Sequence, residues 1–227
     1  MAEPRVFLAS RNRKKLAEME RILAAHVPGV RVLGLDDLAD LGVPDYAEPV
    51  EDRPDFHGNA ALKARAGLRA TGLPTLADDS GLCVDALNGM PGVLSARWSG
   101  LRKAATGATE VDEANNRLLL AQLEDVPDER RTGHFACAVV LAHLGADGTE
   151  QEIAVEGRMP GRLVRAPRGE NGFGYDVVFV AEEYVTDGPP DSWLTTAQLD
   201  SEAKDAVSHR GRALRAIAPR VAAVLGG

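Results

Sequence analysis

Four short strings of the sequence combine residue types that could act on a phosphorylated small molecule. The first is Ser10-x-Asn12-x-x-Lys15, which lies between a short apolar run and a helical pattern. Its remaining positions are the cations Arg11, Arg13 and Lys14. A helix that begins here offers unpaired N–H groups and a positive dipole end, which attract phosphate. The structural alternative is that Asn12 only caps the helix and the cations are solvated.

The second string is Ala77-Asp78-Asp79-Ser80-Gly81, which follows a predicted short strand. Adjacent carboxylates repel each other unless something neutralises them, and Mg²⁺ takes oxygen ligands of this kind. A carboxylate here could also orient an attacking water. The acidic stretch 45–55, which includes Glu51, could supply a second metal ligand. The alternatives are an Asx-type turn after the strand and a solvated acidic loop.

The third string, residues 169–176, places three glycines around Phe173 and Tyr175 in a chain that is only 4% aromatic. Glycines let a backbone approach a flat ligand closely, and an aromatic ring could stack on a base. Asp176 could accept a hydrogen bond from a ring N–H. A glycine-rich hairpin with core aromatics is the alternative structure for this string.

The fourth string starts at Lys204 and continues through Ser208 to Arg212, with the strong donors His209 and Arg210 side by side. An exposed basic helix start would explain this string without any ligand. The four strings together favour a nucleoside triphosphate, since they offer a cationic turn, carboxylates for Mg²⁺, a ring for a base and paired donors.

The elements that must position these strings alternate between strand and helix, which predicts an α/β fold. Residues 5–9 are short and apolar, as in a buried strand, and Leu16, Met19 and Leu23 then mark one face of a helix that ends at Pro28-Gly29. Further helices are expected over about 59–71 and 115–123, and strands over 30–35, 75–77, 134–144, 151–156 and 177–180. Pro219 should kink or split a C-terminal helix.

Composition narrows the class of protein. The chain has 227 residues, of which 44% are hydrophobic and 26% charged, so it is not disordered throughout. This length predicts one domain or a small two-lobed unit. The net charge of −8 argues against a partner that is polymeric nucleic acid, but not against a small phosphorylated ligand.

Other classes are excluded by the absence of their signals from the sequence. No stretch approaches the ~20 consecutive apolar residues of a membrane helix, and residues 1–10 lack a signal-peptide core, which predicts a cytoplasmic protein. Cys83 and Cys137 lie far apart without a CxxC pattern. They are therefore expected as two small buried thiols rather than zinc ligands or a disulfide framework.

The wording and order of these strings resemble the inosine triphosphate pyrophosphatase family, from Val6 to about Leu214. Two more strings belong to the resemblance, Asn59-Ala60-x-x-Lys63-Ala64 and Pro91-Gly92-Val93-x-Ser95-Ala96-Arg97. The resemblance implies an elongated α/β body of two lobes, a mixed sheet flanked by helices with the active site in the cleft between the lobes. It also implies that residues 1–227 form one domain whose lobes are not independent, and that the protein is usually a homodimer.

The family resemblance further implies Mg²⁺-dependent hydrolysis of ITP, dITP and XTP to a nucleoside monophosphate and pyrophosphate. Asp79 matches the catalytic acid–base position and a metal ligand, and Lys15 and Asp78 join it as catalytic candidates. Glu51 is a looser match for the second metal ligand. The implied substrate contacts are Ser10, Arg11, Asn12, Arg13, Lys14, Lys15, Ser80, Arg97, Phe173, Gly174, Tyr175, Asp176, Lys204, His209 and Arg210.

Three features depart from the family pattern. Val177 and Gln198 stand where a proline and an acid are common, and the loop 182–193 is longer than expected. Two other classes of function stay open. One is a pyrophosphatase for modified pyrimidine nucleotides or a simple phosphatase, and the other is a nucleotide-binding module without catalysis.

Overall fold

A computed structural model describes residues 3–101 and 103–226, without the side chains of 103 and 104. The chain groups into two compact units. Unit 1 comprises Met1–Asp79, Cys137–Gly157 and Arg212–Gly227, and unit 2 comprises Ser80–Ala136 and Arg158–Gly211. None of the helices in the described ranges is both long and apolar enough to cross a membrane.

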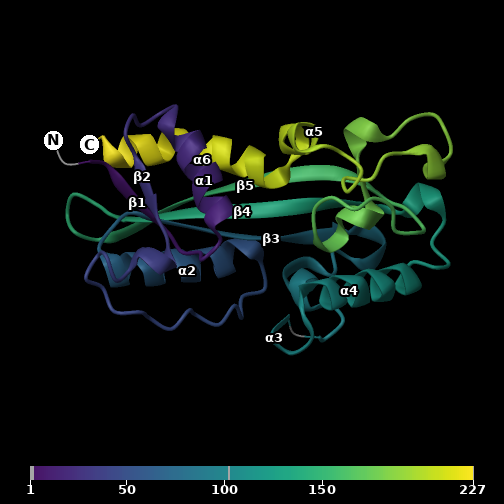
Figure 1. Cartoon of the computed structure of the whole chain (residues 1–227), viewed down its shortest axis with the longest axis horizontal. Helices are drawn as coiled ribbons and strands as arrows, with labels where there is room; N and C mark the ends of the chain where they lie inside the picture. The colour runs from purple at the N-terminus through teal and green to yellow at the C-terminus, as the bar shows by residue number, and fades with distance from the viewer. Residues whose placement is uncertain (1–2, 102, 227) are drawn as a thin grey trace. The chain divides into compact units, whose positions relative to one another are not determined.

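The strands form one six-stranded mixed sheet in the order β2-β1-β3-β4-β5-β6 (Figure 1). β1 pairs parallel with β2 and β3, and β5 pairs antiparallel with β6. The strands are β1 (Arg5–Leu8), β2 (Arg31–Leu33), β3 (Thr75–Val84), β4 (Thr132–Leu144), β5 (Glu150–Leu163) and β6 (Phe179–Ala181). The helices are α1 (Arg13–Ala24), α2 (Phe56–Thr71), α3 (Lys103–Thr106), α4 (Ala108–Gln122), α5 (Ser201–Val207) and α6 (His209–Leu225). The predicted α/β class is confirmed.

Within unit 1, helices cover both faces of the strands, with α1 and α6 on one face and α2 on the other (Figure 1). Leu76 of β3 packs with α1 and α6, whereas the next residue, Ala77, packs against α2. This alternation follows from the two-residue period of a strand, and burial on both faces explains why the strands are apolar runs. In the same way Val139 of β4 joins the first face and Val140 the second.

The boundaries of α1 and α2 follow from their capping residues. The Asn12 side chain accepts hydrogen bonds from the backbone N–H groups of Lys14 and Lys15, at 3.0 and 3.3 Å, and so begins α1 at Arg13. Asp55 caps α2 through the Gly58 N–H. Gly72 ends α2 in a left-handed conformation with φ of 69°, which glycine adopts without a Cβ penalty.

Unit 2 has its own hydrophobic core, which includes Leu82 and Val84 of β3, Leu119 and Leu123 around the end of α4, and β6. α4 lies alongside the segment that contains the short 3₁₀ helix η5 (Gly174–Val178), as Figure 1 shows. The cysteines are not joined in a disulfide. Cys137 is buried as expected, but Cys83 is only partly buried.

The clearest differences from the sequence-based expectations concern β3, β5, α4 and α6. β5 ends at Leu163, seven residues after the predicted end at Glu156. β3 continues through Asp78 and Asp79 to Val84 instead of ending at Ala77. α4 begins at Ala108, seven residues before the predicted start at Asn115. Pro219 does not split α6, which is one helix over His209–Leu225, because Ile217, Ala218 and Val221 around the proline are buried in the unit 1 core.

The largest fully buried side chain of the described residues is Arg131, which is 2% exposed. Its guanidinium donates to the carbonyls of Leu123, Leu163 and Val164, at 2.6, 3.2 and 3.2 Å. One carbonyl follows the end of α4 and the others lie at the end of β5, so the arginine holds these two elements together. Burial lowers the pKa of this guanidinium.

We expect Arg131→Leu to lower the free energy of unfolding by about 2–3 kcal/mol, because three buried carbonyls lose their donors. Chemical denaturation measures this change. The neighbouring Arg130 is exposed, so Arg130→Leu serves as the control and should stay within about 0.5 kcal/mol of the native chain. Equal stability of the two variants would contradict the structural role.

Candidate active site

The predicted site residues fall into two groups, one in each unit. Unit 1 holds the turn 10–15, Glu51, Asp78 and Asp79. Unit 2 holds the remaining predicted residues, namely Ser80, Arg97, Phe173, Gly174, Tyr175, Asp176, Lys204, His209 and Arg210.

Asp78 and Asp79 do not form a carboxylate pair on one side of the sheet. They are neighbours on the extended strand β3, so their side chains point to opposite faces. The Asp78 carboxylate accepts hydrogen bonds from Lys15 Nζ at both oxygens, at 2.9 and 2.8 Å. The Asp79 carboxylate instead accepts from Asn59 Nδ2 at 3.0 Å. The expected turn after Ala77 is therefore wrong, and each acid has a separate environment.

The Lys15–Asp78 ion pair is largely shielded from solvent. The Asp78 side chain is 8% exposed and that of Lys15 is 25% exposed. A carboxylate that is this well buried needs a partner cation, since an unpaired buried charge is strongly destabilising. Lys15 comes from the first turn of α1, so the pair also fixes α1 against β3.

Asn59 is a site residue to which the sequence analysis assigned no role. Its side chain is completely buried, its Nδ2 donates to Asp79, and its Oδ1 accepts from the Arg53 N–H at 3.0 Å. Both ends of the amide are therefore used, which fixes its orientation. The signal in the sequence was a polar residue on the apolar face of a predicted helix, where burial requires hydrogen-bond partners.

Glu51 is held beside Asn59 by the same helix. Lys63 Nζ lies 2.6 Å from Glu51 Oε1, and its side chain is 16% exposed. Because Asn59 and Lys63 are four residues apart on α2, they share one face of the helix. The carboxylates of Asp79 and Glu51 are thus each bound by a side chain from successive turns of α2.

These two carboxylates suit a hard cation that needs few protein ligands. Mg²⁺ is commonly bound by one or two carboxylates, with water and substrate phosphates as its other ligands. Among the described residues there is no cluster of three or more His, Cys, Asp or Glu side chains that could hold a metal. The donor set therefore fits Mg²⁺ shared with a phosphate better than a cage made by the protein alone.

The cations of the turn 10–15 have different partners. Arg11 pairs with Asp36 at 3.1 Å and Asp45 at 3.2 Å, and Arg13 pairs with Asp37 at 3.2 Å. The hydrogen bond that Arg11 donates to Asp36, helped by the negative charge of the nearby Asp45, raises the pKa of Arg11. The remaining residues of the turn are Ser10, which accepts from the Asn12 N–H at 3.2 Å, and Lys14, which is exposed.

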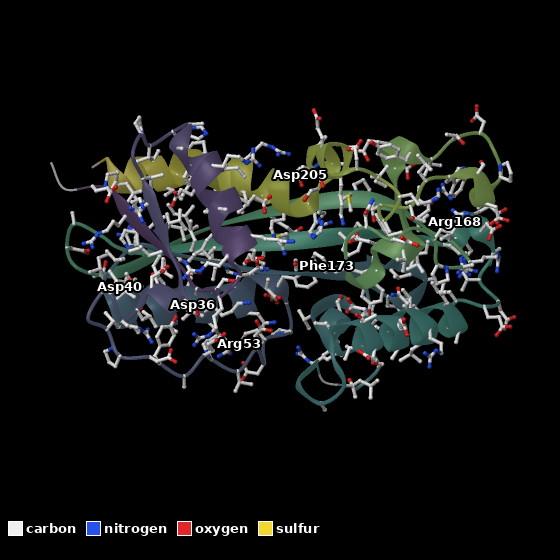
Figure 2. The ribbon with its side chains drawn as sticks, viewed as in Figure 1. Asp36, Asp40, Arg53, Arg168, Phe173 and Asp205 are labelled. Carbon is white, nitrogen blue, oxygen red and sulfur yellow. The ribbon has the colours of Figure 1, made fainter. Side chains whose placement is uncertain are left out.

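In unit 2 the glycine-rich string divides its two aromatic side chains between solvent and core. Phe173 is 69% exposed, and its place is labelled in Figure 2. Tyr175 is 4% exposed, and its hydroxyl donates to the Ser95 carbonyl at 2.9 Å. Burial raises the pKa of Tyr175. Phe173 is therefore the ring that this string exposes to solvent, while Tyr175 anchors the string in the core.

Asp176 is the centre of a polar network within unit 2. Its Oδ2 accepts from Lys204 Nζ at 2.6 Å and from the Phe173 N–H at 2.9 Å. Its Oδ1 accepts from the Thr196 hydroxyl at 2.8 Å. An ionised carboxylate has about four lone-pair sites, so three are used and about one is left for the ring N–H of a base.

The predicted residues His209 and Arg210 of unit 2 lie at the start of α6. The Arg210 Nη2 is 3.5 Å from Ser80 Oγ, and the His209 ring stacks on Phe135 with centroids 5.0 Å apart. Arg97 is exposed at the end of the 3₁₀ helix η3 (Gly92–Arg97).

The long loop 182–193 is held by its own hydrogen bonds. Trp193 Nε1 donates to the carbonyls of Thr186 and Gly188, at 3.0 and 3.1 Å. The guanidinium of Arg168, labelled in Figure 2, donates to the carbonyls of Pro190, Asp191 and Trp193. Arg168 immediately precedes the glycine-rich string, so the loop braces the start of that string.

Comparisons with known proteins agree with this geometry. The model of the Ham1 family matches residues 6–220. The dITP/XTP pyrophosphatase of Nocardia farcinica is 54% identical over 225 residues, which cover 99% of this chain and 98% of that protein. The dITP/XTP pyrophosphatase of Corynebacterium jeikeium is 52% identical over 218 residues, with 93% and 94% covered.

Solved structures extend the comparison to the fold. A nucleoside-triphosphatase, or dITP/XTP pyrophosphatase, from Mycobacterium abscessus superposes with a TM-score of 0.72 at 49% identity, covering 95% of this chain and 99% of that one. A HAM1 protein from Coxiella burnetii gives a TM-score of 0.74 at 36% identity, with 96% and 98% covered.

Lys15→Met should lower the free energy of unfolding by about 2–3 kcal/mol, because it leaves the Asp78 carboxylate buried without its cation. The exposed neighbour Lys14 provides the control, and Lys14→Met should change stability by no more than about 0.5 kcal/mol. Urea denaturation of both variants measures the difference. Adding Asp78→Leu to Lys15→Met should restore part of the loss, and a further loss would contradict the ion-pair assignment.

Proposed function

The chain belongs to the Ham1 family and is a hydrolase of nucleoside triphosphates, and we propose that its substrates are the deaminated purine nucleotides dITP, XTP and ITP. The reaction breaks the bond between the α-phosphorus and the oxygen that bridges to the β-phosphate, releasing a nucleoside monophosphate and pyrophosphate. The names of the relatives support the substrate class. The observation in this chain that carries the proposal is the placement of Asp79 and Glu51 by successive turns of α2.

Mg²⁺ is the metal that the family resemblance implies, and Asp79 and Glu51 are the residues that would hold it. When bound, it supplies positive charge that neutralises the phosphates as the bond breaks. Glu51 already pairs with Lys63, so a metal ion would share this carboxylate with the lysine or displace it.

We assign the proton transfer to Asp79, which orients the attacking water or removes its proton. Asn59 fixes the carboxylate by donating to Oδ2 and is a positioning residue for it. Lys15 binds the triphosphate, and Asp78 acts through Lys15 because it holds the ammonium group at both oxygens. The turn residues Ser10, Arg11, Asn12, Arg13 and Lys14 are proposed to contact the phosphates as well.

Residues of unit 2 are proposed to bind the base. Phe173 stacks on the purine, and Asp176 with Lys204 supplies polar contacts, next to Gly174 and Tyr175. His209 and Arg210 donate to O6, which hypoxanthine and xanthine carry as an acceptor. Adenine has an N6 amine there, so donors would face donors, and a polar pocket rejects such a mismatch strongly. Ser80 supports Arg210 through their contact at 3.5 Å.

Three broader expectations remain proposals. Residues 1–227 act as one domain, which is supported by the three strands β3, β4 and β5 that each contribute to both units. The protein is a homodimer, as the family resemblance implied, and it is located in the cytoplasm, as the sequence signals at residues 1–10 and the missing membrane helix predicted. Light scattering of the purified protein tests the dimer.

The deciding experiment is a panel of nucleoside triphosphates incubated with Mg²⁺ and scored for pyrophosphate. We expect dITP, XTP and ITP to give pyrophosphate and monophosphate far faster than ATP. Orthophosphate as the product would indicate a simple phosphatase, preference for modified pyrimidines would indicate the other pyrophosphatase class, and binding without turnover would indicate a binding module.

Asp79→Asn should abolish pyrophosphate release, and retained turnover would refute its role.

Arg210→Ala should reduce turnover of ITP far more than turnover of ATP, since only ITP accepts a hydrogen bond at position 6. The ratio of kcat/KM for the two substrates measures this loss. Arg215 is an exposed residue of the same helix, and Arg215→Ala should leave the ratio unchanged. Equal losses on ITP and ATP would contradict the base-recognition role of Arg210.

A further inference from the structure

One face of α4 carries three polar residues, of which Asp112 and Asn116 contact the base-binding string and Asn115 contacts Ser95 and Ser99. Asp112, Asn115 and Asn116 are spaced at i, i+3 and i+4, so they lie on the same side of the helix. Asn115 is 2% exposed and Asn116 is 5% exposed. Asparagine is seldom buried to this degree without a specific partner.

The shared partner of Asp112 and Asn116 is the backbone of a single residue, Gly174. Its N–H donates to Asp112 Oδ2 at 2.8 Å, and its carbonyl accepts from Asn116 Nδ2 at 2.8 Å. Asn116 Nδ2 also donates to the Asp112 carbonyl at 2.9 Å. Side chains one turn apart on α4 therefore hold both polar groups of Gly174.

The geometry of Asn116 shows which of its atoms matters. Its Nδ2 faces two carbonyl oxygens, which only an N–H donor can satisfy. Its Oδ1 is buried and finds no hydrogen-bond partner among the described residues. An unsatisfied buried acceptor is destabilising. At this position the Nδ2 donor of Asn116 is used, whereas its Oδ1 acceptor is not.

Phe173, which precedes Gly174, depends on this backbone for its orientation. Its ring is 69% exposed, so core packing does not hold it. Gly172 and Gly174 on either side have φ of 84° and 62°, which are left-handed values. The Phe173 N–H is held by Asp176 at 2.9 Å. Restraints on the flanking peptides, together with Lys204 Nζ at 5.7 Å from the ring centroid, therefore decide where the ring points.

We propose that Asp112 and Asn116 are positioning residues that fix the Gly174 peptide and thereby orient Phe173 for stacking on the purine base. This inference rests on the proposed function, which assigns base binding to Phe173. The inference extends the base site to α4. Neither Asp112 nor Asn116 contacts the base itself. Removing either side chain loosens the ring without touching the carboxylates and lysine assigned to the chemistry in unit 1.

Steady-state kinetics of Asp112→Ala on dITP and XTP tests this inference. We expect KM to rise about tenfold, as for the loss of one hydrogen bond to a charged group, with kcat within about twofold of the native value. Asp112→Asn keeps an acceptor oxygen and should recover most of the loss. Glu113 is the exposed neighbour on α4, and Glu113→Ala should leave both constants unchanged.

A double-mutant cycle with Phe173→Ala separates positioning from a general structural role. If Asp112 acts through the ring, Asp112→Ala adds little to the KM of a chain that already lacks it. Additive increases would overturn the inference, as would a fall in kcat at constant KM. Asn116→Leu, which has a similar shape and removes the donor without burying a charge, should repeat the KM effect and guards against misfolding of Asp112→Ala.

Equilibrium binding keeps this inference distinct from the proposed function. We expect Asp112→Ala to weaken binding of inosine monophosphate about tenfold and to leave binding of inorganic tripolyphosphate unchanged. Equal weakening of both ligands would overturn the positioning role. A native chain that binds inosine monophosphate but releases no pyrophosphate from any substrate would instead overturn the proposed function.

Discussion

The pleat of β3 is the constraint on which the site of unit 1 depends. Two aspartates that are adjacent in sequence cannot share one face of an extended strand, so Asp78 and Asp79 serve opposite sides of the sheet. Asp78 holds Lys15 of α1, and Asp79 is held by Asn59 of α2. One strand therefore presents a lysine-bound carboxylate to one helix and an amide-bound carboxylate to the other. A shift of register by one residue would exchange the two acids.

In unit 2 the residues proposed to bind a ligand are positioned in a different way. Here side chains hydrogen-bond to backbone groups. Asp112 and Asn116 hold the Gly174 peptide, Asp176 holds the Phe173 N–H, and the Tyr175 hydroxyl is anchored on Ser95. Phe173, the exposed ring, thereby projects from a segment whose main chain is restrained on each side. Contacts with residues outside the glycine-rich string therefore order its main chain.

The sequence predicts the local features of this protein well, because they depend on neighbouring residues. Asn12 as a helix cap and the apolar face of α1 both follow from residue type and spacing, and the structure contains each of them. The motif strings also identify the family to which the chain belongs. What local patterns miss are partners that are distant in sequence, such as Lys15 and Asp78, which are 63 residues apart. The length of β3 is missed for the same reason, since one of its neighbours in the sheet, β4, comes from a distant part of the chain.

The aspartates that pair with Arg11 and Arg13 change the electrostatic field around the turn at the start of α1. These arginines are paired with Asp36, Asp37 and Asp45 on the protein surface. Beyond a Debye length of about 8 Å, such pairs have little net field. The paired arginines therefore exert little long-range pull on anions in general, and any attraction they exert becomes strong only at contact distance. An anion that approaches this surface meets short-range contacts there rather than a field that draws it in from afar.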